Sequence, residues 1–252
     1  SLINYGIVIV LYIIMMIMQA TGNLSSSMKG FLVPVCIYVI MAVSLNLVVG
    51  ILGELSLGHA GFMCVGAYTS AIFSKLTEST ITAAPLRFTL AILVGAFFAA
   101  VFGILIGIPV LRLKGDYLAI VTLAFGEIIK NVVNVINFGV DSNGWHFSTK
   151  STMELGLEAD GNVIIKGAQG ISGTPKDANF TVGVILVLLT LFIVQNLIKS
   201  RDGRAIMAIR DNRIAAESVG INITKYKLMV FTISASLAGA AGALNSHNYA
   251  TL

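Results

Sequence analysis

Long apolar runs are the feature that most constrains the fold of this 252-residue chain. A helix needs about 20 apolar residues to cross the hydrocarbon core of a bilayer, and seven segments meet that requirement. They cover residues 2–19, 30–52, 55–74, 88–111, 116–137, 180–198 and 228–247. Only 11% of the residues are charged, against roughly 25% in soluble domains. The sequence therefore predicts an all-α, polytopic transmembrane helical bundle that forms one domain, residues 1–252.

The third of these segments is interrupted by glycine. Residues 53–62 read Gly-Glu-Leu-Ser-Leu-Gly-His-Ala-Gly-Phe, which makes a poor continuous helix. Irregular backbone at membrane depth is tolerated where it is buried in protein or lines a water-filled cavity. We therefore expect a break or a re-entrant start here, and Ser56 and His59 become candidates for lining a translocation path. A hydrogen bond at a helix end is the alternative role for His59.

The distribution of basic residues predicts the orientation. The loop 199–227 carries seven of the sixteen lysines and arginines, and cytoplasmic loops are enriched in both. If this loop is cytoplasmic, alternation of the spans also places Arg112 and Lys114 inside, the N-terminus inside and residue 252 outside. Because the basic residues lie in short loops between spans, the pI of 9.1 indicates membrane topology and not a nucleic-acid partner.

The segment 138–178 is then the one sizeable extracytoplasmic loop. It contains Asp-Gly and Asn-Gly turn signals beside short runs of valine and isoleucine, and Asp160-Gly-Asn-Val-Ile-Ile165 fits part of a hairpin. The sequence leaves two interpretations open, an ordered linker and a docking surface for a partner.

The loop 199–227 predicts an amphipathic helix from Gly203 to Gly220, about 25 Å long. Gly220 suits the left-handed residue that ends a helix. One interpretation is a helix that lies on membrane lipid. Its acidic residues Asp202, Asp211 and Glu217 fit anionic headgroups poorly, which favours a soluble protein partner.

The sequence lacks the motifs of several classes of enzyme and metal site. There is no Gly-Lys dipeptide and hence no Walker A loop, and neither H-E-x-x-H nor G-x-S-x-G occurs. Cys36 and Cys64 lie inside apolar segments without a C-x-x-C pair, so no disulfide framework and no metal site are predicted. The chain is expected not to be an enzyme, and nucleotide-driven work would come from a partner.

Glu127 and Lys130 are ionisable residues at membrane depth. Glu127 lies eleven residues after Asp116, or about 16 Å into the bilayer at 1.5 Å per residue. Such groups cost about 2.5 to 3.5 kcal/mol at the centre of a span and mostly face the bundle or a water-filled cavity. Lys130 is on the same helix face and within pairing range. A structural ion pair, a lining of the translocation path and a proton relay are the three interpretations.

Small residues recur at helical spacing in the later spans, where they allow helix backbones to approach closely. The pairs are Ala96 with Ala100, Gly103 with Gly107, Ala235 with Gly239, and Ala238 with Gly242.

Three ordered blocks resemble LivM-type permeases of branched-chain amino-acid ABC importers over nearly the whole chain. The blocks are Leu55-Ser-Leu-Gly-His-Ala-Gly-Phe62 with Gly66-Ala-Tyr68, Gly115 to Ile129, and Gly203 through Ala-Ala-Glu-Ser-Val-Gly-Ile221 to Leu244. Gly170-Ile-Ser-Gly-Thr-Pro175 is similar to the glycine-rich element that this family carries before its next span. Family members continue with further spans after the last block, so we expect the C-terminal part of the pathway to be missing.

The resemblance implies a permease subunit of the bacterial inner membrane, with a translocation path for branched-chain amino acids. It implies a second, homologous permease, two cytoplasmic ATPases that use ATP and Mg²⁺, and an extracytoplasmic amino-acid-binding protein, whereas this chain itself needs no cofactor. ABC importers dock their ATPases through a loop of pattern E-A-A-x-x-x-G, and Ile214 stands here where the Glu would be. The ATPase-coupling residues predicted in the loop 199–227 are Gly203, Arg204, Arg210, Ala215, Ala216, Glu217 and Gly220.

Two other functions remain open at this point. Urea and short-chain amide importers use very similar permeases. A proton-coupled secondary transporter would use Glu127 as its relay, with the helix in 199–227 as an amphipathic spacer.

Overall fold

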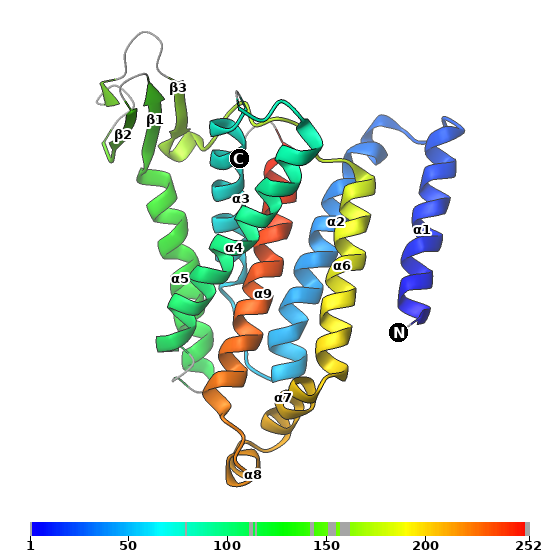
Figure 1. The fold of residues 1–252 in the computed structure, drawn as a ribbon, viewed down its shortest axis with the longest axis vertical. Helices are drawn as coiled ribbons and strands as arrows, with labels where there is room; N and C mark the ends of the chain where they lie inside the picture. The colour runs from blue at the N-terminus through cyan, green and yellow to red at the C-terminus, as the bar shows by residue number, and fades with distance from the viewer. Residues whose placement is uncertain are drawn as a thin grey trace.

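The computed structural model describes residues 2–78, 80–110, 113, 115–141, 144–150, 155–156 and 162–249. Helices dominate, and the long ones lie side by side in a bundle with a small sheet at one end (Figure 1). They are α1 (Leu2–Ala20), α2 (Ser26–Asn46), α3 (His59–Leu76), α4 (Ala84–Val110), α5 (Asp116–Val135), α6 (Phe180–Lys199), α7 (Arg201–Asp211), α8 (Arg213–Ser218) and α9 (Ile223–Ser246).

Six of these described helices are long and apolar enough to cross a membrane: α1, α2 with the π-helical turn Leu47–Leu52 that follows it, α4, α5, α6 and α9. The shorter and more polar α3 runs through the same bundle, packed against α4 and α9. The predicted polytopic bundle of about seven spans is therefore confirmed.

The two long loops lie at opposite ends of the bundle. Figure 1 shows α7 and α8 beyond the lower end of the spans and the sheet beyond the upper end. This arrangement fits the predicted alternation of the spans. Arg112, Lys114 and residue 252, on which that prediction also drew, lie outside the described residues.

The loop 138–178 contains more strand than the sequence suggested. Strands β1 (Asn137–Asp141), β2 (Gly144–Ser148) and β3 (Asn162–Lys166) form an antiparallel sheet in the order β2-β1-β3, with a register shift in the β1–β3 pair between Phe138 and Gly139. The predicted hairpin strand thus begins at Asn162, and Asp160 lies outside the described residues. Ile164, Ile165 and Ile171 attach the sheet to α3 by packing around Ala71.

Helices α3, α4 and α9 meet through residues that have little or no side chain. A Cβ added to Gly66 of α3 would lie 2.3 Å from the carbonyl oxygen of Gly239 in α9, and one added to Gly239 would lie 2.4 Å from the Cβ of Ala99 in α4. At Gly242 an added Cβ would lie 2.0 Å from the carbonyl oxygen of Met63. The small-residue spacing of α9 therefore lies at direct backbone contacts, as the sequence predicted.

Helix α1 is attached to the rest of the bundle at few points. Its hydrophobic side chains are mostly exposed, and Figure 1 shows it set apart at the edge of the bundle. Its contacts with α6 include a 3.1 Å hydrogen bond between the hydroxyls of Tyr12 and Thr181 and ring packing of Tyr12 on Phe180.

We expect Gly66→Ala to lower the stability of the protein, because the new methyl group cannot fit without moving the α9 backbone. Overpacking of this kind costs about 1 to 3 kcal/mol, which thermal unfolding in detergent would detect. Gly30→Ala is the matched control, since nothing lies within 4 Å of the added Cβ in α2. Equal unfolding midpoints for the two variants would contradict the packing argument.

Candidate functional site

The predicted interruption of the third span is present. Helix α2 continues into the π-helical turn Leu47–Leu52, Gly53 then adopts φ 79°, and the chain is non-helical until α3 begins at His59. The end of the irregular segment contacts α5: the amide of Leu57 donates to Thr122 Oγ1 at 3.0 Å. A Cβ on Gly58 would lie 2.0 Å from the carbonyl oxygen of Thr122. Protein contacts thus replace helical hydrogen bonds at this depth.

His59 joins three helices at the start of α3. Its Nε2 lies 2.8 Å from the hydroxyl of Ser44 in α2 and 3.5 Å from that of Ser234 in α9. Both His59 and the nearby Ser56 are buried. The two hydroxyl contacts give His59 the geometry of a hydrogen-bonding group between helices, and the role of Ser56 and His59 in a translocation path stays a prediction.

A buried ion pair fixes the interruption to the start of α9. The ammonium of Lys227 pairs with the carboxylate of Glu54, and their side chains are 3% and 17% exposed. The two residues are 173 positions apart, so no local sequence pattern indicates the pair. The pair connects the end of the loop 199–227 directly to the irregular segment.

The loop 199–227 holds two helices, so the prediction of one continuous helix over 203–220 was wrong. Asn212 has extended backbone, with φ −155°, and its side chain accepts from the amide of Ala215 at 3.0 Å. That cap ends α7 and starts α8 in a new direction. Ser200 caps α7 and Asn222 caps α9 in the same way. Gly220 has φ 86°, the left-handed conformation that was predicted.

Some of the predicted coupling residues are buried in this loop, and others are exposed. Gly203 is buried where α6 turns into α7, since an added Cβ would lie 2.2 Å from the carbonyl oxygen of Leu197. Ala216 is buried with Ile209 and Ile223, so its side chain does not lie on an outer docking face. Arg204, Ala215, Glu217 and Gly220 are exposed.

The sequence analysis did not single out the two most exposed apolar side chains in and just after α8. Ile214 is 81% exposed and Val219 is 75% exposed. Exposed apolar groups at the tip of a loop are typical of a surface that a partner covers. The signal was available, because Ile214 stands at the position where the ABC pattern has a charged residue.

Arg210 connects α7 to the interrupted span. Its guanidinium donates to the carbonyl oxygen of Gly50 at 3.1 Å and also pairs with Asp211. Its aliphatic stem fills the space beside Gly53, where an added Cβ would lie 2.7 Å from the arginine Cγ. Arg210 is thus exposed on one side and on the other joins α7 to the segment that carries Glu54.

Glu127 and Lys130 form a 3.1 Å ion pair on the outer face of α5, with side chains 58% and 63% exposed. Asn131 and Asn134 are exposed as well, and their spacing places them on the same helix face. We call Glu127, Lys130, Asn131 and Asn134 the polar stripe of α5. Lipid would leave these groups poorly solvated, so this face belongs against water or a protein partner.

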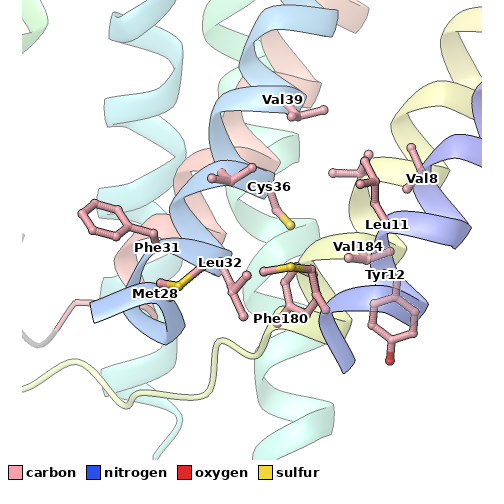
Figure 2. A pocket seen from close by; sticks show the side chains of 13 residues that line it. Val8, Leu11, Tyr12, Met28, Phe31, Leu32, Cys36, Val39, Phe180 and Val184 are labelled. Atoms are coloured by element: carbon pink, nitrogen blue, oxygen red, sulfur yellow. The ribbon is translucent and has the colours of Figure 1, made fainter. Parts of the chain in front are cut away.

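A cavity of about 460 Å³ between α1, α2 and α6 has the opposite character. Figure 2 shows side chains such as Val8, Phe31 and Val184 lining it, with the hydroxyl of Tyr12 at one edge. A charged solute would lose its hydration there without replacement hydrogen bonds. This cavity is therefore unsuited to carry a zwitterion.

We expect Lys227→Met to destabilise the protein by about 3 to 5 kcal/mol, because it leaves the Glu54 carboxylate buried without a partner. Glu54→Gln in the same chain should restore much of the loss. A double-mutant cycle measured by thermal unfolding gives the coupling. The exposed pair Glu127 and Lys130 is the control, with an expected coupling of about 0 to 1 kcal/mol; equal coupling in the two pairs would contradict the burial argument.

Comparison with known proteins agrees with this architecture. Residues 27–251 match the family described as branched-chain amino acid transport system, permease component. The chain is 38% identical over 218 residues to the high-affinity branched-chain amino acid transport system permease proteins LivM of Salmonella typhimurium and Escherichia coli, with 82% of this chain and 49% of each relative covered. Identity to the nucleoside ABC transporter permease protein NupC of Lactococcus lactis is 24% over 201 residues, which cover 76% of this chain and 58% of that relative.

The chain spans about half the length of the LivM relatives that it matches. No solved structure matches it. The match of 225 consecutive residues (27–251) to one family, together with the six apolar helices, identifies a multi-pass membrane transport subunit. The chain belongs to the family of permease components of branched-chain amino acid transport systems.

Proposed function

We propose that this chain forms half of the translocation path of an ABC importer for branched-chain amino acids. In this proposal a second, homologous permease forms the other half. Two cytoplasmic ATPases that use ATP and Mg²⁺ drive the cycle, and an extracytoplasmic binding protein delivers the amino acid. The substrate assignment follows the printed names of the LivM relatives. The complex lies in the bacterial inner membrane.

The observation that carries the proposal is the capped loop of α7 and α8 at one end of the bundle. Its exposed side chains Ile214 and Val219 suit a cleft on a soluble partner, and its buried side is fixed to the spans. With this loop in the cytoplasm, the N-terminus is cytoplasmic and the sheet of β1, β2 and β3 is extracytoplasmic. The sheet is then the surface available to a binding protein.

A continuous set of contacts leads from this loop toward α5. Arg210 of α7 contacts Gly50 and Gly53, and Lys227 holds Glu54 in the same irregular segment. Leu57 and Gly58 at the end of that segment contact Thr122 of α5. Movement of α7 and α8 with the ATPases would therefore shift the segment 50–58 and, with it, the helix that carries the polar stripe.

The polar stripe of α5 suits the wall of the path that faces the second permease. Its exposed ion pair of Glu127 and Lys130 needs water or a polar partner, which a passage between two permeases supplies. A moving zwitterion would meet a carboxylate and an ammonium on one face. The competing proposal of a proton-coupled transporter gives Glu127 a different role, that of the proton carrier.

Uptake of leucine into proteoliposomes decides between these two mechanisms. The complete complex should take up leucine only with ATP and the binding protein, and Glu127→Gln should leave ATP dependence intact at every pH. Leucine uptake driven by an imposed proton gradient, without the ATPases, would overturn the ABC mechanism. Replacing leucine with urea, a short-chain amide or a nucleoside tests the alternative cargoes of related importers.

We expect Ile214→Asp to prevent co-purification of the ATPases while leaving the unfolding midpoint of the permease unchanged, because the new charge lies on the exposed face. Ala216→Asp should instead lower the unfolding midpoint, because it buries a charge among Ile209 and Ile223. Pull-down and thermal unfolding measured on both variants separate the two effects. Retention of the ATPases by Ile214→Asp would show that α8 is not their docking site.

A further inference from the structure

Two adjoining cavities lie where the C-terminal end of α5 meets the sheet and the short helix Gly167–Gln169. One has a volume of about 440 Å³ and is lined by polar side chains that include Asn134, Lys150, Lys166 and Gln169. The other, of about 370 Å³, is lined by Asn131, Val132, Val135, Ile136 and Thr149. Val135 and Thr149 line both cavities, so one ligand can occupy the two together.

The polar cavity is lined by two basic residues. They are Lys150 and Lys166, and the described residues of its lining include no aspartate or glutamate. Within the described part of the chain, neither ammonium forms an ion pair with a carboxylate. Two ammonium groups at one cavity favour a carboxylate ligand through charge-assisted hydrogen bonds.

The second cavity is suited to an aliphatic group. Val132, Val135 and Ile136 supply most of its wall, and the valine side chains are about half exposed. Burial of such surface stabilises a bound ligand by about 25 cal/mol per Å² of apolar area. The carbonyl groups at the C-terminal end of α5, which lies beside both cavities, carry partial negative charge and suit an ammonium group.

We propose that the two cavities form an outer binding site for an α-amino acid with a branched aliphatic side chain. Lys150 and Lys166 hold its carboxylate, and Val132, Val135 and Ile136 contact its side chain. The inference rests on the proposed function and adds the place where the permease itself selects its cargo.

The site is continuous with the polar stripe of α5. Asn134 lines the polar cavity and Asn131 lines the apolar one, and Glu127 lies one helical turn further along the same face. One turn is about 5.4 Å, comparable to the length of an amino acid. A ligand leaving the outer site would therefore meet the ion pair of Glu127 and Lys130 next.

Thiol protection in the complete complex tests this site. Val135→Cys places a thiol on the wall that the two cavities share, and a membrane-impermeant maleimide measures its accessibility in proteoliposomes. Leucine at four times its dissociation constant should slow modification about fivefold, as expected for one site with a protection factor of 1 + [L]/Kd. Leucinol, which lacks the carboxylate, should protect much less, and Lys150→Met with Lys166→Met should abolish protection by leucine.

Lys176→Cys is the matched control, because it is exposed at the same end of the bundle and lies outside both cavities. Leucine should not alter its modification. Three results would each contradict the proposed site. They are equal protection by leucine and leucinol, protection that persists without the two lysines, and no protection at all. If an anionic lipid occupies the cavities, vesicles of phosphatidylglycerol should slow modification where leucine does not, which also overturns it.

The thiol-protection experiment and the uptake experiment test the outer site and the proposed function separately. ATP-driven leucine uptake by the unmodified complex, with no protection of the introduced thiol, would reject the outer site alone. Absence of ATP-driven leucine uptake would reject the proposed function, whatever the protection result.

Discussion

The structure depends on the direct contact of three helix backbones. Gly66 of α3, Gly95 of α4 and Gly239 of α9 lie against one another with no room for side chains. In a bilayer, where lipid is as apolar as leucine, close packing of this kind is a main source of helix association. It makes α3, α4 and α9 one block, to which the irregular segment before α3, α5 and the sheet are attached.

The outer faces of the bundle differ in polarity, and this difference indicates what surrounds each face in the membrane. The polar stripe of α5 carries an ion pair and two asparagines on an exposed face. On the side of α1, α2 and α6, many large apolar side chains are exposed and the cavity lining is apolar. The first face requires water or protein, whereas the second is compatible with lipid. The proposed importer, in which this chain works beside a second permease, needs both kinds of surface.

Much of this architecture could be predicted from local sequence. The apolar runs predict the spans, the glycines of 53–62 predict the interruption, and Gly220 predicts the end of a helix. The buried pair of Glu54 and Lys227 could not be predicted, because it joins residues far apart in the chain through tertiary packing. The division of 203–220 at Asn212 depended on a side-chain cap that competed with an otherwise favourable helical pattern.

The weak attachment of α1 has a consequence for assembly during synthesis. Tyr12 bonds Thr181, so this contact forms only after a further 169 residues have been made. At about 5 to 20 residues per second, that delay is roughly 10 to 30 seconds. During this time α1 lacks its contact with α6, and its own apolar sequence must hold it in the bilayer. The apolar run 7–18 of α1 is thus required by the order of translation as well as by the finished fold.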